Sequence, residues 1–378
     1  MRFAIDARYI REKPSGIGTY VRALVDRMPF EAPLDQFLFW AHPRAARPLS
    51  TAPNTREITI QPGPGSPWPV LWPSRYTSFG EIDLFHSPHN LMSRGMRCPT
   101  VVTLHDLMSI ERPDLHLQGL ERLVKSVYYP QAVWRALRSA TRLIVPTAAT
   151  ADRVRALCPE ATSRTHVIWE AADTCFRPAD DPDVARNRAL ALTGIEGPYL
   201  LVLGADSPTK RHVGALRAFA AVAPAGWRLV LLERPGARNH AERRRRLKAL
   251  AVRLGVDDRI VWLSRAERPD VAVLLQAAAA LIQPSVYEGF GLPIVEAMAC
   301  GCPVIATDIP PFREITSGAA LLVAQDDIGA LASAIQALVD SPDRRRSMSA
   351  CGLARSREFS WDRCARETLA VYRDALRS

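Results

Sequence analysis

A nine-residue segment, residues 288–296 with the sequence EGFGLPIVE, constrains the fold of this chain more than any other feature. Two carboxylates, Glu288 and Glu296, enclose two glycines and a proline. Pro293 suits the first position of a helix, because its φ is already helical and its missing N–H is not needed there. A glycine follows the next apolar residues and suits a helix end, so we predict a short helix over Ile294–Cys300.

The apolar run just before this segment, residues 278–282, predicts a buried strand, so the whole reads as strand, glycine-bearing loop and helix. Amides at a helix N-terminus can point at an anion, and the helix dipole favours negative charge there, which predicts a diphosphate site. We expect Glu296 to reach ribose hydroxyls and Glu288 to reach the group that the diphosphate carries. A turn with solvated glutamates is the simpler alternative, which a lone Gly-x-Gly would favour. The loop residues expected to bind this ligand are Gly289, Phe290, Gly291 and Leu292.

The start of the chain holds a second, weaker signal of the same kind. A strand at Phe3–Ile5 is followed by Gly16 and Gly18, which permit close backbone approach, and by a predicted helix over Thr19–Arg27. Alone this pattern fits an ordinary turn as well as a phosphate loop. A dinucleotide-binding oxidoreductase would need a third glycine and a shorter distance between the strand and the first glycine. We therefore do not expect this chain to be such an oxidoreductase.

The arrangement of apolar runs predicts an α/β chain with two parallel sheets, because strands alternate with helical stretches and the series begins again near residue 199. With 378 residues the chain is long enough for two domains. We expect the boundary within residues 169–178, a surface loop at the proline-rich residues 62–73, and a final helix to Leu376 capped by Ser360. The other predicted strands are Phe37–Trp40, Leu84–His86, Thr100–Leu104, Leu143–Val145, His166–Ile168, Tyr199–Gly204, Leu229–Leu232, Ile260–Leu263, Ala280–Ile282 and Val304–Ala306.

The composition of the chain limits the classes of partner that it could bind. The net charge of +10 fits nucleic acid, an anionic lipid surface or an anionic substrate, but no nucleic-acid-binding motif accompanies it, so we expect no nucleic acid. The densest basic run, residues 243–246, lies in a helical pattern over residues 241–254 and is typical of a solvated helix face. The seven cysteines complete no zinc pattern and are expected to be reduced. We expect no secretory signal and no transmembrane segment, hence a cytoplasmic chain.

The segment Glu288–Glu296 resembles the E-x7-E segment of retaining glycosyltransferase family 4, and the flanking residues 284–287 and 297–305 are similar to that family as well. The resemblance implies a GT-B fold, with two Rossmann-like parallel-sheet domains facing a cleft. It further implies an acceptor domain over residues 1–168 and a nucleotide-sugar donor domain over residues 169–358. The helix of residues 359–378 is expected to pack back on the first domain.

The resemblance also implies roles for single residues. His105, after the strand Thr100–Leu104, matches the family histidine beside the transferred sugar, and Asp106 supports it. In the segment that begins at Gly204, which is expected to bind the donor, Lys210 matches a lysine that neutralises the departing diphosphate. The family usually has an arginine just before that lysine, where this chain has Thr209. Arg211, at the next position, is the candidate to replace the missing charge. The expected catalytic residues are His105, Asp106, Lys210 and Glu288.

The expected reaction is transfer of a sugar from a nucleoside diphosphate to a glycan, without a metal or other cofactor. The sequences of these motifs most resemble those of bacterial enzymes that use GDP-mannose or a related GDP-sugar in polysaccharide or lipopolysaccharide assembly. A UDP-sugar-dependent transferase and a non-catalytic sugar-binding relative are the alternatives. A polyprenyl-diphosphate-linked acceptor would suit a basic protein peripheral to the inner face of the plasma membrane. The stretch Leu117–Arg138 fits an interfacial helix and a helix packed on its own domain equally well.

Overall fold

The computed structural model describes residues 1–11, 15–61, 63, 66, 71, 75, 81–116, 122–204, 207–222, 224–233 and 240–377. The expected surface loop 62–73 lies largely outside these ranges, as do residues 117–121 at the start of the expected interfacial helix. The chain forms two compact units. Unit 1 comprises residues 1–170 with 360–378, and unit 2 comprises residues 171–359.

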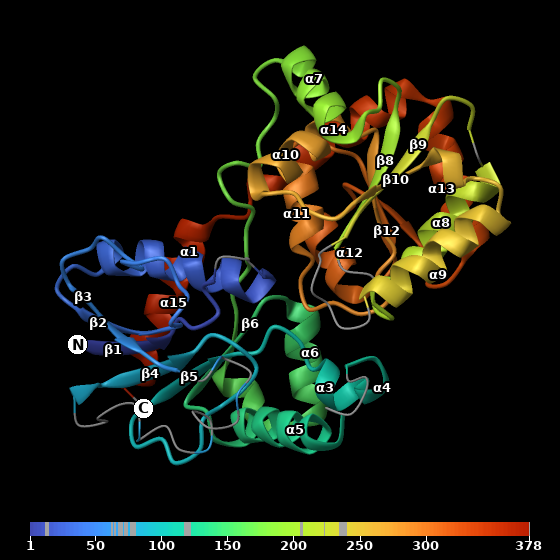
Figure 1. Cartoon of the computed structure of the whole chain (residues 1–378). Helices are drawn as coiled ribbons and strands as arrows, with labels where there is room; N and C mark the ends of the chain where they lie inside the picture. The colour runs from blue at the N-terminus through green and yellow to red at the C-terminus, as the bar shows by residue number, and fades with distance from the viewer. Residues whose placement is uncertain are drawn as a thin grey trace. The chain divides into compact units, whose positions relative to one another are not determined.

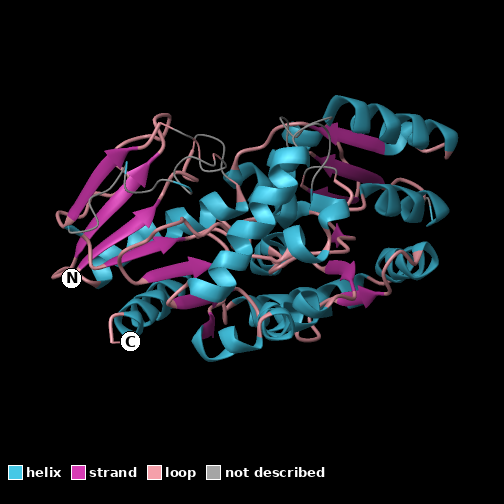
Figure 2. Ribbon diagram, turned by 90° about the horizontal axis from the view of Figure 1, so that it is seen from below, coloured by secondary structure: helices cyan, strands magenta, loops and turns pink. Residues whose placement is uncertain are grey.

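Unit 1 is built on a parallel sheet of seven strands among its described residues, in the order β3-β2-β1-β4-β5-β6-β7. In Figure 2 the strands next to the labelled N-terminus form a twisted series, as the chirality of L-residues requires. The strands are β1 (Arg2–Asp6), β2 (Gln36–Ala41), β3 (Thr55–Thr59), β4 (Leu84–Ser87), β5 (Thr100–Thr103), β6 (Arg142–Val145) and β7 (Thr165–Val167). The helices are α1 (Gly16–Glu31), α3 (Met108–Glu111), α4 (Pro113–His116), α5 (Arg122–Ser139), α6 (Ala148–Leu157) and α15 (Trp361–Ala375).

Unit 2 is built on a second parallel sheet, of six strands among its described residues, in the order β10-β9-β8-β11-β12-β13. Figure 1 shows α8, α9 and α13 on one side of these strands and α10, α11 and α14 on the other. The strands are β8 (Tyr199–Leu203), β9 (Arg228–Leu232), β10 (Ile260–Leu263), β11 (Ala280–Gln283), β12 (Val304–Thr307) and β13 (Leu321–Val323). The helices are α7 (Pro182–Thr193), α8 (His212–Val222), α9 (His240–Arg253), α10 (Arg268–Ala277), α11 (Leu292–Ala299), α12 (Pro310–Thr316), α13 (Ile328–Asp340) and α14 (Pro342–Ser356).

Helix α1 begins at Gly16, three residues before the predicted start at Thr19. The reason is Ser15, whose hydroxyl accepts a hydrogen bond from the amide of Gly18 at 3.0 Å and so caps the helix. Gly16 and Gly18 therefore lie in the first turn of the helix, not in a free loop. A Cβ on Gly18 would lie 2.7 Å from the carbonyl oxygen of Tyr9, so this close approach requires glycine.

Helix α15 packs on α1 within unit 1. Its N-cap is Ser360, as predicted, and the Ser360 side chain accepts from the amide of Arg363. Near its other end, the hydroxyl of Tyr372 hydrogen-bonds Nδ1 of His86 at 2.6 Å, and the Tyr372 ring lies 5.0 Å from that of Phe3. The last residues of the chain therefore belong to the core that the first strand begins.

Helix α5 packs on its own unit through Val133, Ala136 and Leu137, all fully buried in an apolar cluster with β5 and β6. Tyr128 and Tyr129 lie against a second small cluster around Leu91. The described part of this helix thus favours the packed interpretation over the interfacial one.

The close contact of Gly18 gives a test of the α1 start. We expect Gly18→Ala to lower the free energy of unfolding by about 1–3 kcal/mol, because the added methyl group meets a backbone oxygen that cannot rotate away. Gly214→Ala in α8 is the matched control, since its Cβ would find its nearest neighbour at an ordinary 3.6 Å. There the better helix propensity of alanine should leave stability equal or slightly raised. Urea unfolding of both variants provides the comparison, and equal stabilities would contradict the expected clash.

Candidate functional site

The order of the second sheet reverses between β8 and β11, and ligands of doubly wound sheets bind outside the carboxyl ends of strands at such a point. The segment after β8 carries Gly204 and Lys210, and the segment after β11 carries Glu288. The ammonium of Lys210 is directly hydrogen-bonded to the carboxylate of Glu288, and both side chains keep about a fifth of their surface exposed, 24% and 18%. The fold therefore brings two of the predicted catalytic residues into contact.

A tight turn over residues 207–210 positions Lys210 against Glu288. Its amide donates to the carbonyl oxygen of Ser207 at 3.0 Å, and the Ser207 hydroxyl is bonded to the hydroxyl of Thr209 at 2.8 Å. The carbonyl of Thr209 accepts from the amide of Val286 at 2.9 Å, which joins this turn to the segment after β11. Thr209, which stands where the family usually has arginine, is buried and takes part in the turn itself.

Arg211 points to a different partner. Its backbone is left-handed, with φ of 51°, and its guanidinium pairs with Asp326 at 3.2 Å. Lys210 and Arg211 thus engage different carboxylates in this structure. A role for Arg211 in donor binding stays a prediction.

The N-terminus of α11 has the features of an anion site. The helix spans Leu292–Ala299 and so begins two residues before the predicted Ile294–Cys300, with Gly291 as N-cap and Pro293 in its first turn. No side chain among the described residues caps it, and its first turn holds no acidic residue, so its dipole is not compensated by the helix itself. Gly291 has φ of 122°, and a Cβ there would lie 2.8 Å from the ring of Phe312. Glycine is therefore required to turn the chain from Phe290 into the helix.

Glu296 lies just past the first turn of α11, and its side chain is only 9% exposed. The guanidinium of Arg268, the first residue of α10, donates to Glu296 Oε1 at 3.0 Å. The same guanidinium forms an ion pair with Asp173 at 2.6 Å. Sequence reasoning identified Glu296 but missed Arg268 and Asp173, because nothing in the pattern of the chain links residues so far apart.

His105 follows β5 in unit 1 and is held on both ring nitrogens. Nδ1 lies 2.8 Å from a carboxylate oxygen of Glu170, and Nε2 lies 3.1 Å from the carbonyl oxygen of Pro88. A carboxylate and a carbonyl both accept, so this geometry suits a doubly protonated imidazolium. Burial opposes the charge, but the hydrogen bond and the negative charge of Glu170 outweigh burial and raise the pKa of His105.

Asp106 supports the histidine through Asn90. The Asp106 carboxylate accepts from the amide of Met108 at 3.0 Å and from the side-chain amide of Asn90 at 3.3 Å. The side-chain oxygen of Asn90 in turn accepts from the backbone amide of His105 at 2.8 Å. This chain of contacts fixes the backbone of His105. No pattern in the sequence singles out Asn90 or Glu170, which lie on other segments.

A fully buried polar network lies at the carboxyl ends of β1 and β4. The carboxylate of Asp6 accepts from the Arg8 guanidinium at 2.7 Å and from His89 Nε2 at 3.0 Å. Burial alone would raise the pKa of Asp6, but these two partners hold it far below its usual value. His86 is the opposite case, because burial and the neighbouring histidines lower its pKa to about 3. Asp6 and Arg8 are therefore charged, whereas His86, which is hydrogen-bonded to Thr103 and Tyr372, is neutral.

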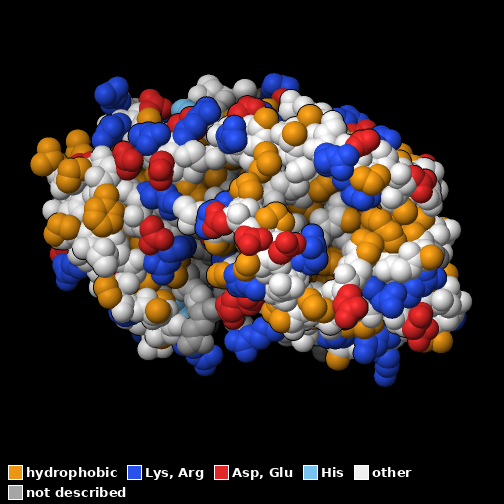
Figure 3. All heavy atoms as spheres, turned by 90° about the horizontal axis from the view of Figure 1, so that it is seen from above, with side chains coloured by type: hydrophobic (Ala, Val, Ile, Leu, Met, Phe, Trp, Pro, Cys, Tyr) orange, Lys and Arg blue, Asp and Glu red, His pale blue; other side chains and the backbone are white. Residues whose placement is uncertain are grey.

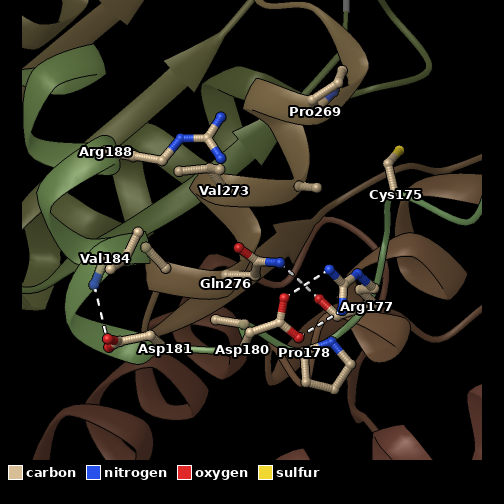
Figure 4. A pocket seen from close by; sticks show the side chains of 13 residues that line it. Cys175, Arg177, Pro178, Asp180, Asp181, Val184, Arg188, Pro269, Val273 and Gln276 are labelled. Carbon is tan, nitrogen blue, oxygen red and sulfur yellow. Dashed lines mark hydrogen bonds and ion pairs between the residues drawn. The ribbon is translucent and has the colours of Figure 1, made fainter.

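A hollow of about 490 Å³ in unit 2 lies elsewhere, between α7, α10 and residues 175–181 (Figure 4). The Arg177 guanidinium pairs with Asp180, and Gln276 donates to the carbonyl of Arg177. Asp181 caps α7. These polar groups satisfy one another, so the hollow offers no convergent set of catalytic groups.

Within the described ranges, no group of three or more histidine, cysteine, aspartate or glutamate side chains could hold a metal ion. No helix there combines the length and the apolar character that a membrane span needs. On the face drawn in Figure 3, basic side chains alternate with acidic ones, so the net positive charge forms no continuous basic surface on that face.

The contact between His105 and Glu170 predicts a pH dependence. A histidine whose folded pKa exceeds its unfolded value of about 6.5 adds stability below that value and loses it as the pH rises through the folded pKa. We expect Glu170→Gln to lower the pKa of His105, so the stability difference between the two proteins should be larger near pH 6 than near pH 9. Histidine titration by NMR and thermal unfolding at both pH values measure the two effects. An unchanged His105 titration in the variant would contradict the charged pair.

Family models match both halves of the chain. Residues 14–175 match Glycosyltransferase Family 4, and residues 191–353 match Glycosyl transferases group 1. The D-inositol 3-phosphate glycosyltransferase of Mycobacterium avium (strain 104) is 33% identical over 313 residues, which cover 79% of this chain and 71% of that protein. The O-antigen chain mannosyltransferase B of Escherichia coli is 27% identical over 306 residues, covering 76% and 72%.

Two solved structures show the same fold. Sucrose-phosphate synthase from Thermosynechococcus elongatus superposes with a TM-score of 0.80 at 23% identity and covers 99% of this chain and 98% of its own. Anabaena HepE in complex with UDP and glucose superposes with a TM-score of 0.75 at 20% identity and covers 98% of each chain. The chain has two Rossmann-like parallel sheets, and both of its halves match family models. This chain is therefore a GT-B glycosyltransferase and belongs to family 4, the glycosyl transferases of group 1.

Proposed function

We propose that this enzyme transfers mannose, or a related sugar, from a GDP-sugar to a glycan or lipid-linked glycan in bacterial polysaccharide or lipopolysaccharide assembly, with retention of configuration. The observation that carries the proposal is the edge of the second sheet, where Lys210, Glu288 and the uncapped N-terminus of α11 follow neighbouring strands. The similarity to an O-antigen chain mannosyltransferase supports the choice of mannose.

The proposed chemistry needs no protein acid, because a nucleoside diphosphate is already a good leaving group. The N-terminus of α11 and the ammonium of Lys210 would stabilise the charge that develops on the diphosphate, which is usually the largest catalytic contribution. In this proposal the diphosphate takes the place of Glu288 beside Lys210. The released carboxylate of Glu288 then positions the sugar and offsets the positive charge of an oxocarbenium-like transition state.

His105 is proposed to act beside the sugar as a fixed positive group. Its ring nitrogens are both engaged by acceptors, so a proton cannot leave without breaking a contact to Glu170 or Pro88. This argues against general acid–base catalysis by His105 and for a role in orientation. Asp106 serves that role through Asn90, as its contacts indicate.

The proposal for the acceptor rests on the charge of the chain. A sugar chain on a polyprenyl diphosphate would suit the net charge of +10, with the protein peripheral to an anionic membrane. Transfer assays with nucleotide sugars and lipid-linked glycan acceptors test donor and acceptor together. We expect GDP-mannose to serve as donor. Transfer from a UDP-sugar instead would support the alternative donor class, and binding of nucleotide sugars without any transfer would indicate a non-catalytic relative.

The proposed site holds its diphosphate with amides and a lysine, so activity should survive exhaustive treatment with a chelator. Transfer rates measured before and after chelation provide the test. Loss of transfer that added Mg²⁺ or Mn²⁺ restores would count against this architecture.

Replacing Lys210 should damage turnover far more than replacing Glu296. The charge that Lys210 would meet develops in the transition state, whereas the ribose contact of Glu296 is the same in the ground state. We expect Lys210→Ala to lower kcat by roughly 100-fold or more, in the range seen when one charge-stabilising donor is removed. Glu296→Ala should chiefly raise the KM for the donor, because the donor loses about 1.5–3 kcal/mol of binding free energy. Steady-state kinetics separate the two effects, and normal turnover in Lys210→Ala would remove the leaving-group assignment.

A further inference from the structure

We propose that Arg268 is a positioning residue that fixes the carboxylate of Glu296 and so gives the donor site its selectivity for ribose hydroxyls. The inference rests on the proposed function, because the ribose role of Glu296 belongs to it. It adds a residue, from a different helix, through which that role would be exerted.

Arg268 begins α10 and contacts two acidic side chains of unit 2 at once. Its Nη2 donates to Glu296 Oε1 at 3.0 Å, and its Nε lies 2.6 Å from Asp173 Oδ2. The guanidinium carbon also lies 4.9 Å from the ring centre of Phe176. The guanidinium is therefore held on one edge by Asp173, across its plane by Phe176, and on another edge by Glu296.

The burial of Glu296 explains why such a partner is needed. With 9% of its side chain exposed, the carboxylate has lost most of its hydration, which is costly without a charged partner. A guanidinium presents its donors in a rigid plane, so it sets the direction of the carboxylate as well as its charge. A lysine at the same position would supply charge from a single flexible point.

Glutamate has three rotatable side-chain bonds, and a carboxylate free to turn would have to be ordered when a ligand binds. Fixing it beforehand lowers the cost of binding a group that the carboxylate recognises. Two adjacent ribose hydroxyls are such a group, since both can donate to a carboxylate. The benefit vanishes for a nucleotide that lacks these hydroxyls, so the role of Arg268 should appear as selectivity.

The test compares GDP with 2′,3′-dideoxy-GDP by calorimetry on the full chain, using wild type, Glu296→Gln, Arg268→Ala and the double variant. If the wild type binds UDP instead of GDP, the test uses UDP and 2′,3′-dideoxy-UDP. We expect the wild type to prefer the ribonucleotide roughly tenfold or more, as a charge-assisted hydrogen bond implies, and Glu296→Gln to lose most of that preference. Arg268→Ala should reduce the preference at least about threefold, and it should add nothing in the Glu296→Gln background.

Two further variants separate positioning from folding. Arg186→Ala is the matched control, because it also removes a guanidinium from unit 2 but only from an exposed pair with Asp183. It should leave the preference unchanged. Arg268→Lys keeps the charge and should lie between Arg268→Ala and wild type. If Arg268→Ala weakens both nucleotides equally, the residue is merely structural and the inference is overturned, while the donor site stands. If Glu296→Gln keeps the full preference, the ribose assignment itself fails.

Discussion

The carboxyl edge of the second sheet depends on one backbone constraint, the conformation of Gly291. Its φ of 122° and the 2.8 Å that would separate an added Cβ from the Phe312 ring exclude any other residue without rearrangement. This turn sets Leu292 as the first residue of α11, and thereby the direction of the first amides and of the helix dipole. It also places Glu296 just beyond that turn, on the buried side where Arg268 meets it. The anion site and the ribose contact proposed here share this single origin.

Two ion pairs of this chain differ in how deeply they are buried. In unit 1, Asp6 and Arg8 are fully buried and paired with each other, and removing either would leave an uncompensated charge in the interior. Such a pair is a fixed part of the scaffold. In unit 2, Lys210 and Glu288 keep part of their surface in contact with solvent. A partly exposed pair costs less to separate, because water or a ligand oxygen can replace the lost partner. The exchange of Glu288 for a diphosphate is thus easier than any rearrangement of the buried network.

Most of the fold could be predicted because buried parallel strands are continuous apolar runs. The strand β3 was missed because Thr55–Thr59 has no such run, and the short edge strand β13 (Leu321–Val323) was missed as well. The start of α1 was placed too late because the cap at Ser15 was overlooked. Local motifs marked Glu288, Glu296, Lys210 and His105, since each lies beside a strand end or helix start. Glu170 and Arg268 could not be found in this way, because their partners are distant in sequence and only the folded chain brings them together.

The departure at Thr209 has a structural consequence that the sequence alone does not show. The buried Thr209 side chain closes the turn with Ser207, and its carbonyl joins that turn to the segment after β11. The family arginine is therefore replaced by a residue that stiffens the loop carrying Lys210. The nearby cation, Arg211, is turned toward Asp326 by its left-handed backbone. With one cation aimed at Glu288 and the other engaged elsewhere, the proposed diphosphate site relies on Lys210 and on the α11 dipole together. When a site has fewer cations, its charge stabilisation depends more strongly on the position of those that remain. The turn around Thr209 holds Lys210 in that position.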